Sequence, residues 1–204
     1  GDCAAGEFAH SFNLTDIHTT WTETRAVLGK GQTGIVAELE DMRQALPFPL
    51  TGIDSDNGSE FLNHHLVGYC RTHQIQFTRG RPYKKDDNAH IEQKNWTHVR
   101  RLIGWDRYDS AAAVGLLNDL YRHELRQMMN LFQPTVKLLR KERIGSRLKR
   151  VYDTPQTPLD RLRVCTGADP GRVNDLLRLR AITDPFALAK TIEKKLDRIA
   201  ALAQ

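Results

Sequence analysis

Cysteine is scarce in this chain, and its placement argues against two common kinds of site. Three cysteines occur among 204 residues, at Cys3, Cys70 and Cys165. An odd number at such wide spacing fits neither a disulfide framework nor a zinc site of the CxxC type. His64 and His65 are adjacent, so on a helix their side chains would point about 100° apart and could not easily share one metal ion. We therefore expect reduced, mostly structural thiols and solvated histidines.

Long hydrophobic runs, internal repeats and low-complexity tracts are also absent. No apolar stretch approaches the roughly 18–20 residues that a membrane helix requires, and the first residues lack a signal-peptide pattern. The composition is 40% hydrophobic and 27% charged, with a mean hydropathy of −0.52. These values predict a soluble globular chain with a cytoplasmic location and no membrane partner. The length allows one substantial core, alone or with a small appendage.

Strand and helix patterns alternate along the first two thirds of the chain. Alternating apolar and polar residues predict an antiparallel strand pair over residues 7–17 and 20–28. Helical spacing predicts helices over residues 32–46, 60–73 and 111–132, and a short closing strand is expected over residues 74–78. This order favours an α/β layered domain with a mixed sheet.

Two carboxylates in this region have the residue type that divalent metal chemistry needs. Asp56 lies in the sequence GIDSDNGSEF and Glu92 in AHIEQKNW. Residues 48–54 predict a short strand that turn residues end, so Asp56 is expected at a strand tip. Asp87 and Asn88 are plausible helix N-caps, which would place Glu92 in the first two helical turns. Two hard cations about 4 Å apart, held by carboxylate oxygens, can bind the attacking oxygen and the leaving oxygen of a phosphoryl displacement.

Longer motifs around these carboxylates resemble a known family. SDNGSEF at 55–61, FTRGRPYKKDDNAHIEQKNW at 77–96, NLFQPTVKLLRKER at 130–143 and YDTPQTPLDRL at 152–162 resemble the integrase core of the retroviral integrase superfamily. The similarity is to the transposases of bacterial insertion sequences and covers roughly residues 7–162. It implies a ribonuclease-H-like α/β fold, with a mixed β-sheet flanked by helices, and an enzyme that cleaves and transfers DNA strands during the integration of a mobile element.

The resemblance also implies roles for the two carboxylates. Asp56 corresponds to the second and Glu92 to the third member of an Asp-Asp-Glu triad that holds two Mg²⁺ or Mn²⁺ ions. Asp54 is the rival to Asp56, but the motif matches the aspartate directly before Asn-Gly. The first aspartate of the triad lies on an opening strand, whereas residues 1–6 here look like the turn after that strand. We therefore expect an N-terminal truncation and a poor catalyst.

Four acidic residues near the start are candidates for the missing position. Asp2 lies among turn-forming residues and Asp16 lies at the far end of its strand, and Glu7 and Glu23 are the other nearby acids. The resemblance does not select any of them.

Basic residues gather around the predicted site, although the formal net charge of +5 is modest. The residues expected to contact DNA, as phosphate or stacking partners, are Arg81, Tyr83, Lys84, Lys85, Lys94, Asn95 and Arg100. A further basic cluster follows at Lys137, Arg140, Lys141, Arg143, Arg147, Lys149 and Arg150. For this cluster, taken alone, a solvated helix face is an equally good interpretation. The expected partners are mobile-element ends and target DNA, bound by a homo-oligomer.

The last third of the chain predicts an end to the core and a helical extension. After Pro134 the sequence is basic and then turn-rich, and Pro155 and Pro158 break any continuous helix. We place the catalytic core at residues 1–164 and a helical C-terminal extension at residues 165–204, with helices over Val173–Arg180 and Asp184–Ala203. Two alternatives remain for the whole: a non-catalytic DNA-binding relic, and a ribonuclease-H-like nuclease without a joining step.

Overall fold

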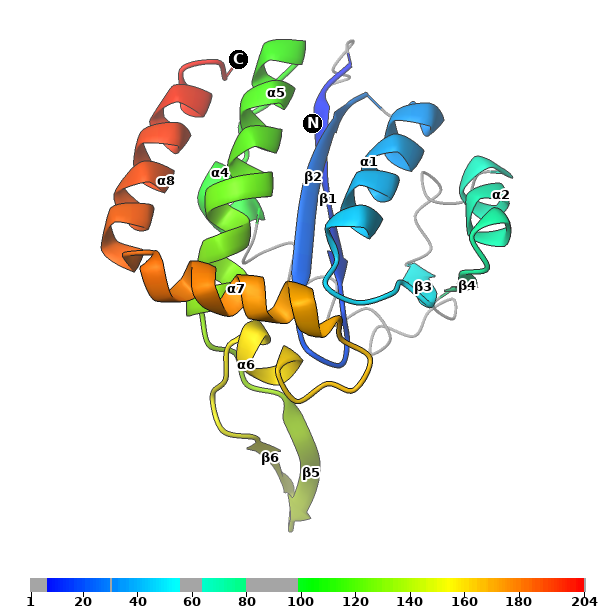
Figure 1. Cartoon of the computed structure of the whole chain (residues 1–204), viewed down its shortest axis with the longest axis vertical. Coiled ribbons are helices and arrows are strands. Elements are labelled where there is room, and N and C mark those ends of the chain that lie inside the picture. Colours follow the sequence, from blue (N-terminus) through cyan, green and yellow to red (C-terminus); the bar gives the residue numbers. More distant parts are fainter. Residues whose placement is uncertain (1–6, 30, 56–63, 80–98, 204) are drawn as a thin grey trace.

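Helices flank two of the short β-sheets of the computed structural model (Figure 1), which describes residues 7–29, 31–55, 64–79 and 99–203. Within these ranges the strands form three two-stranded sheets, two of them antiparallel and one parallel. The predicted α/β class is confirmed. No helix in these ranges is long and apolar enough to cross a membrane.

The first sheet is the predicted N-terminal hairpin. Strand β1, Ala9–Thr15, pairs antiparallel with β2, Thr22–Leu28, and Thr15 pairs with Thr22 next to the turn. The Asp16 carboxylate closes the turn by accepting hydrogen bonds from the backbone N–H and the hydroxyl of Thr19, both at 2.6 Å. The predicted strand pair is confirmed, with slightly shorter strands.

Two long helical segments pack against β2. Helix α1, Gln32–Ala45, buries Ile35, Leu39 and Met42 at helical spacing and ends two residues before Pro47. Helix α5, Ala111–Leu120, continues through two π-helical segments, η3 (Tyr121–Leu125) and η4 (Met128–Phe132). Both predicted helices are confirmed.

Two asparagines on the second segment bond to the outer edge of β2. The Asn118 side chain accepts from the N–H of Ala26 at 2.8 Å and donates to its carbonyl at 2.9 Å. Asn130 bonds to the N–H and carbonyl of Thr22 in the same way, at 2.9 and 2.8 Å. The helix therefore satisfies backbone groups that an uncovered strand edge would leave unpaired.

The second sheet is parallel. Strand β3, Gly52–Ser55, pairs in register with β4, Gln76–Arg79, and helix α2, His64–Thr72, lies between them in the sequence. The predicted strand over residues 48–54 begins later than expected. Pro47 and Pro49 carry no backbone N–H and cannot donate to a β-ladder, so the residues just before Gly52 are unsuited to strand pairing.

The third sheet was not predicted. Strands β5, Leu138–Ile144, and β6, Arg147–Tyr152, form a hairpin within the basic cluster that could equally have been a helix face. Helix α6, Pro158–Leu162, follows it and begins with a capping box between Thr157 and Asp160. Pro158 thus starts a helix, because its missing N–H is unneeded in the first helical turn.

The C-terminal helices pack onto the preceding elements. Helices α7, Pro170–Ile182, and α8, Pro185–Ala200, begin at the N-caps Asp169 and Asp184 and confirm the two predicted helical segments. Leu188, Ile192 and Ile199 of α8 join the apolar cluster of α5, and Val173 and Leu176 of α7 join the cluster around Trp21. The domain boundary at residue 164 stays a prediction.

Candidate functional site

The parallel pair β3–β4 is the part of the structure that leads into the predicted catalytic residues. In the register Ser55 pairs with Arg79, so both strands end at one edge of the sheet. Asp56 is the next residue after Ser55, and residue 80 begins the segment that contains Glu92. In α/β sheets, ligands commonly bind beyond the carboxyl ends of parallel strands. The two segments that carry the predicted carboxylates therefore leave the described structure from a common edge.

Most of the predicted site residues lie outside the described ranges. Asp56 and Glu92 are among them, and so are the predicted DNA contacts Arg81, Tyr83, Lys84, Lys85, Lys94 and Asn95. Their assignments stay predictions.

Arg100 is the predicted contact that the structure does describe. It is exposed, and its guanidinium carbon lies 4.3 Å from the ring centroid of Trp105. The Trp105 side chain is itself 72% exposed. An exposed arginine stacked on an exposed tryptophan presents a cation and an aromatic face together, a combination that suits phosphates and bases. The sequence analysis did not single out Trp105. The available signal was its position five residues after Arg100, a predicted DNA contact.

Asp54, the rival to Asp56, has a local partner. Its carboxylate is exposed and accepts a hydrogen bond of 2.9 Å from the Thr78 hydroxyl on β4. Ser55 is buried, and its hydroxyl has no partner within the described residues. Asp54 therefore links the two strands, and it offers a natural control for Asp56.

Two of the described acids near the N-terminus, Asp16 and Glu23, are held in local interactions. Asp16 closes the β1–β2 turn. Glu23 is fully buried and accepts from the Trp21 indole N–H at 2.9 Å and from Arg126 Nε at 2.7 Å. A carboxylate tied into such contacts is poorly placed to be a metal ligand.

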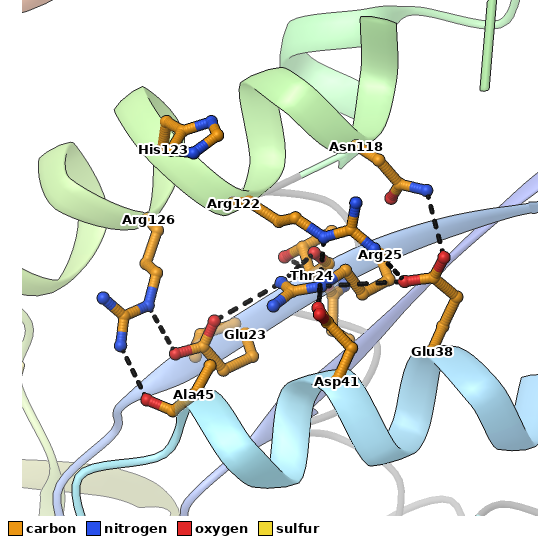
Figure 2. Close-up of polar contacts among 12 residues, drawn as sticks. Glu23, Thr24, Arg25, Glu38, Asp41, Ala45, Asn118, Arg122, His123 and Arg126 are labelled. Atoms are coloured by element: carbon orange, nitrogen blue, oxygen red, sulfur yellow. Dashed lines mark hydrogen bonds and ion pairs between the residues drawn. The ribbon is translucent and has the colours of Figure 1, made fainter. Parts of the chain in front are cut away.

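Glu23 belongs to a larger network of ion pairs between β2, α1 and the segment of α5 and η3 (Figure 2). Arg25 Nε contacts Asp41 at 2.5 Å and Glu38 at 3.8 Å, and its Nη1 lies 3.4 Å from Glu23. A second arginine, Arg122, contacts Glu38 at 2.7 Å and Asp41 at 3.1 Å. We name these residues the β2 network: Glu23, Arg25, Glu38, Asp41, Arg122 and Arg126.

Charge in the β2 network is balanced, with three carboxylates and three guanidinium groups. Partial burial raises the pKa of Asp41, but the hydrogen bonds and charges of Arg25 and Arg122 outweigh this and hold it below its usual range. Arg126 also donates to the backbone carbonyl of Ala45, at 2.9 Å. The network therefore ties two helical segments to a strand. Arginines and carboxylates often form functional sites, but each charged group of this network is paired with another group of the same network.

No group of three His, Cys, Asp or Glu side chains in the part of the chain that the structure describes is arranged to hold a metal ion. The predicted ligands Asp56 and Glu92 lie outside the described ranges. Their oxygen donors are the kind that Mg²⁺ and Mn²⁺ prefer.

Sequence comparison finds a relative without an established role. The chain is 42% identical over 161 residues to the uncharacterized protein y4rM of Sinorhizobium fredii (strain NBRC 101917 / NGR234), a match covering 79% of this chain and 46% of that protein. The chain thus spans about half the length of this relative. No protein-family model matches the chain.

Structural comparison finds retroviral integrases at remote similarity. The catalytic core domain of BIV integrase matches with a TM-score of 0.47 and 16% identity, over 74% of this chain and 82% of that one. A chain of the simian T-cell lymphotropic virus intasome in complex with PP2A regulatory subunit B56 gamma matches with a TM-score of 0.48 and 14% identity, over 64% of this chain and 49% of that one. Similarity of this degree assigns no function by itself.

Proposed function

We propose that this chain is part of a DNA strand transferase, an integrase or transposase that cuts and joins DNA. The observation that carries the proposal is the common carboxyl edge of β3 and β4, at Ser55 and Arg79, from which the segments with Asp56 and Glu92 depart. The motifs around these two residues resemble those of integrase cores. The stacked pair of Arg100 and Trp105 adds a described surface suited to nucleic acid.

Asp56 and Glu92 are the proposed ligands of two Mg²⁺ or Mn²⁺ ions. Bound divalent cations supply activation of the attacking oxygen and stabilisation of the leaving oxygen in a phosphoryl displacement. The chain contributes ionised carboxylates that bind the ions, and basic side chains that hold the DNA phosphates. Because protons compete for carboxylate oxygens, activity is expected to fall in acid.

The finer assignment is a transposase of a bacterial insertion sequence. It rests on the same motifs. The proposed substrates are the ends of a mobile element and target DNA, held by a homo-oligomer, since the joining of two ends suits a symmetric assembly.

The experiment compares single substitutions in the full-length parent protein. Asp56→Asn and Glu92→Gln should each reduce strand joining by more than about 100-fold while DNA binding is retained, since charge stabilisation by metals contributes several kcal/mol. Asp54→Asn is the matched control, two residues from Asp56, and should keep near-normal joining. Joining is followed with labelled element ends in Mg²⁺.

Each outcome has a clear meaning. Normal joining by Asp56→Asn or Glu92→Gln contradicts the assignment. Binding without cleavage by the parent protein supports the non-catalytic relic. Cleavage without joining supports the nuclease, and in that case the two carboxylates should still be needed for cleavage.

A further inference from the structure

The β5–β6 hairpin is a basic arm that projects from the rest of the structure below α6 (Figure 1). Residues 138–152 contain six arginines and lysines and a single glutamate, Glu142. All six basic side chains are exposed, and β5 and β6 contribute no side chain to the apolar clusters of the described core. The arm is therefore not explained by core packing.

Most of the positive charge on the arm is uncompensated. Arg140 contacts Glu142 at 2.6 Å, with 63% of the arginine side chain exposed. Within the described ranges the other five basic side chains have no ion-pair partner: Lys141, Arg143, Arg147, Lys149 and Arg150. This differs from the β2 network, in which every guanidinium has a carboxylate.

The register sorts these residues onto two faces. Lys141 pairs with Arg150 and Arg143 with Leu148, and cross-strand partners in a ladder share a face. We call the side of Lys141, Arg143 and Arg150 the tribasic face; it carries no carboxylate. Glu142 belongs to the opposite face, because adjacent residues of a strand alternate.

The base of the arm is fixed to the core. Asp153 accepts hydrogen bonds of 2.6 Å from the Lys137 backbone N–H and from Arg161 Nη1. Arg161 is only 8% exposed and also donates to the Thr135 carbonyl at 2.8 Å. The hydrogen bond from Arg161 lowers the pKa of Asp153, so this carboxylate is charged at neutral pH. An isolated two-stranded hairpin is marginal in water, and this anchor gives the arm a defined direction.

We propose that the β5–β6 hairpin is an arm that binds duplex DNA in its major groove, with Lys141, Arg143 and Arg150 on the phosphates. Unpaired cations on a projecting ribbon complement a polyanion. The major groove of B-form DNA, about 12 Å wide, admits a two-stranded β-ribbon. The major groove of duplex RNA is deep and narrow and does not. The choice of DNA rests on the proposed function, but binding by the arm requires neither the metal ions nor Asp56 and Glu92.

The binding experiment uses the 204-residue chain and a matched pair of triple variants. Lys141→Gln, Arg143→Gln and Arg150→Gln together remove three charges from the tribasic face. The control, Lys190→Gln, Lys194→Gln and Arg198→Gln, removes three charges from exposed positions of α8. Binding to a labelled DNA duplex of about 30 base pairs is measured by anisotropy over a salt series without divalent metal, where three lost phosphate contacts lower the salt slope by about 2.7.

The hairpin variant should lose about 10- to 100-fold in affinity near 0.1 M salt, and the control should stay within about twofold of the unaltered chain. Unchanged urea midpoints confirm that both triple variants fold. The single variant Lys141→Glu should weaken binding in the same direction. An RNA duplex of the same length should bind more weakly than the DNA duplex.

Three results overturn the inference: equal affinities of the two triple variants, no DNA binding by the unaltered chain, or equal binding of RNA and DNA duplexes. Asp56→Asn in the full-length parent separates this inference from the proposed function. If the hairpin variants bind normally while Asp56→Asn abolishes joining, the arm is wrong and the proposed function stands. If the hairpin variants bind weakly while Asp56→Asn joins normally, the inference about the arm stands and the proposed strand transferase is wrong.

Discussion

The β2 network and the β5–β6 hairpin place the same kinds of side chain in two different settings. In the network three arginines meet three carboxylates, and Arg25 and Glu23 are 2% and 0% exposed. In the hairpin six basic residues accompany a single carboxylate, Glu142, which contacts Arg140, and all six are exposed. Charge is thus balanced around the buried Glu23 and Arg25 and left unbalanced on the exposed hairpin.

The contrast follows from the cost of burying charge. An unpaired charge taken out of water costs several kcal/mol, so a buried arginine persists only with carboxylate or carbonyl partners. Exposed cations need no partner and remain available for a ligand. The arrangement of partners, and not the number of arginines, therefore separates residues that hold the fold from residues that can bind DNA.

The comparison is tested most strongly by removing one carboxylate from each region. Glu23→Gln should lower the free energy of unfolding by about 3–5 kcal/mol, because it leaves Arg126 and Arg25 near a buried site without its negative charge. Glu142→Gln, the matched change in the hairpin, should cost less than about 1 kcal/mol. Urea unfolding followed by circular dichroism measures both.

A double variant adds a check on the cause. Glu23→Gln combined with Arg126→Gln should recover part of the lost stability, since the unpaired guanidinium is removed. A loss below about 1 kcal/mol for Glu23→Gln alone would show that the β2 network behaves like a surface pair.

A smaller effect is expected at the edge of β2 that does not pair with β1. Asn118 bonds to this edge from the helical segment. Asn118→Ala should destabilise the fold by about 1–3 kcal/mol, because the N–H and carbonyl of Ala26 lose their buried partners. Asn174→Ala makes the same substitution at an exposed position of α7 and should stay within about 0.5 kcal/mol of the parent. Equal urea midpoints for the two variants would contradict the role given to Asn118.

Sequence patterns predicted the elements that bury an apolar face. The hairpin of β1 and β2, helix α1 and the two C-terminal helices all have periodic apolar residues or clear caps, such as Asp169 and Asp184. Strand β3 was also expected before Asp56, although it begins only at Gly52.

The β5–β6 hairpin escaped prediction for a physical reason. Basic residues occupy both of its faces, so the alternation of apolar and polar residues that marks a half-buried strand is missing. The local signal for a hairpin was the pair of turn residues Gly145 and Ser146. Gly145 has a positive φ of 62°, which suits a two-residue hairpin turn. The β2 network was equally hidden, because Arg122 and Arg126 lie 81 and 103 residues after the carboxylates Asp41 and Glu23 that they contact.

The smallest expected effect lies within the β2 network itself, at Asp41, whose side chain is 42% exposed. Burial raises the pKa of Asp41, but the hydrogen bonds and charges of Arg25 and Arg122 lower it by a larger amount. The native pKa of Asp41 therefore lies below the ordinary value of 3.8. A lowered native pKa adds stability above pH 4, and this stability is lost as the pH falls through the native pKa. Asp41→Asn should therefore be less stable than the parent near pH 6, by no more than about 1 kcal/mol because solvent screens the pair. Urea unfolding at a series of pH values should show the two proteins converging as the pH falls through the native pKa of Asp41, whereas Asp175→Asn, at an exposed ion pair of α7, should stay within about 0.5 kcal/mol of the parent near pH 6. A constant difference between Asp41→Asn and the parent across this range would show that the carboxylate charge is not what Asp41 contributes.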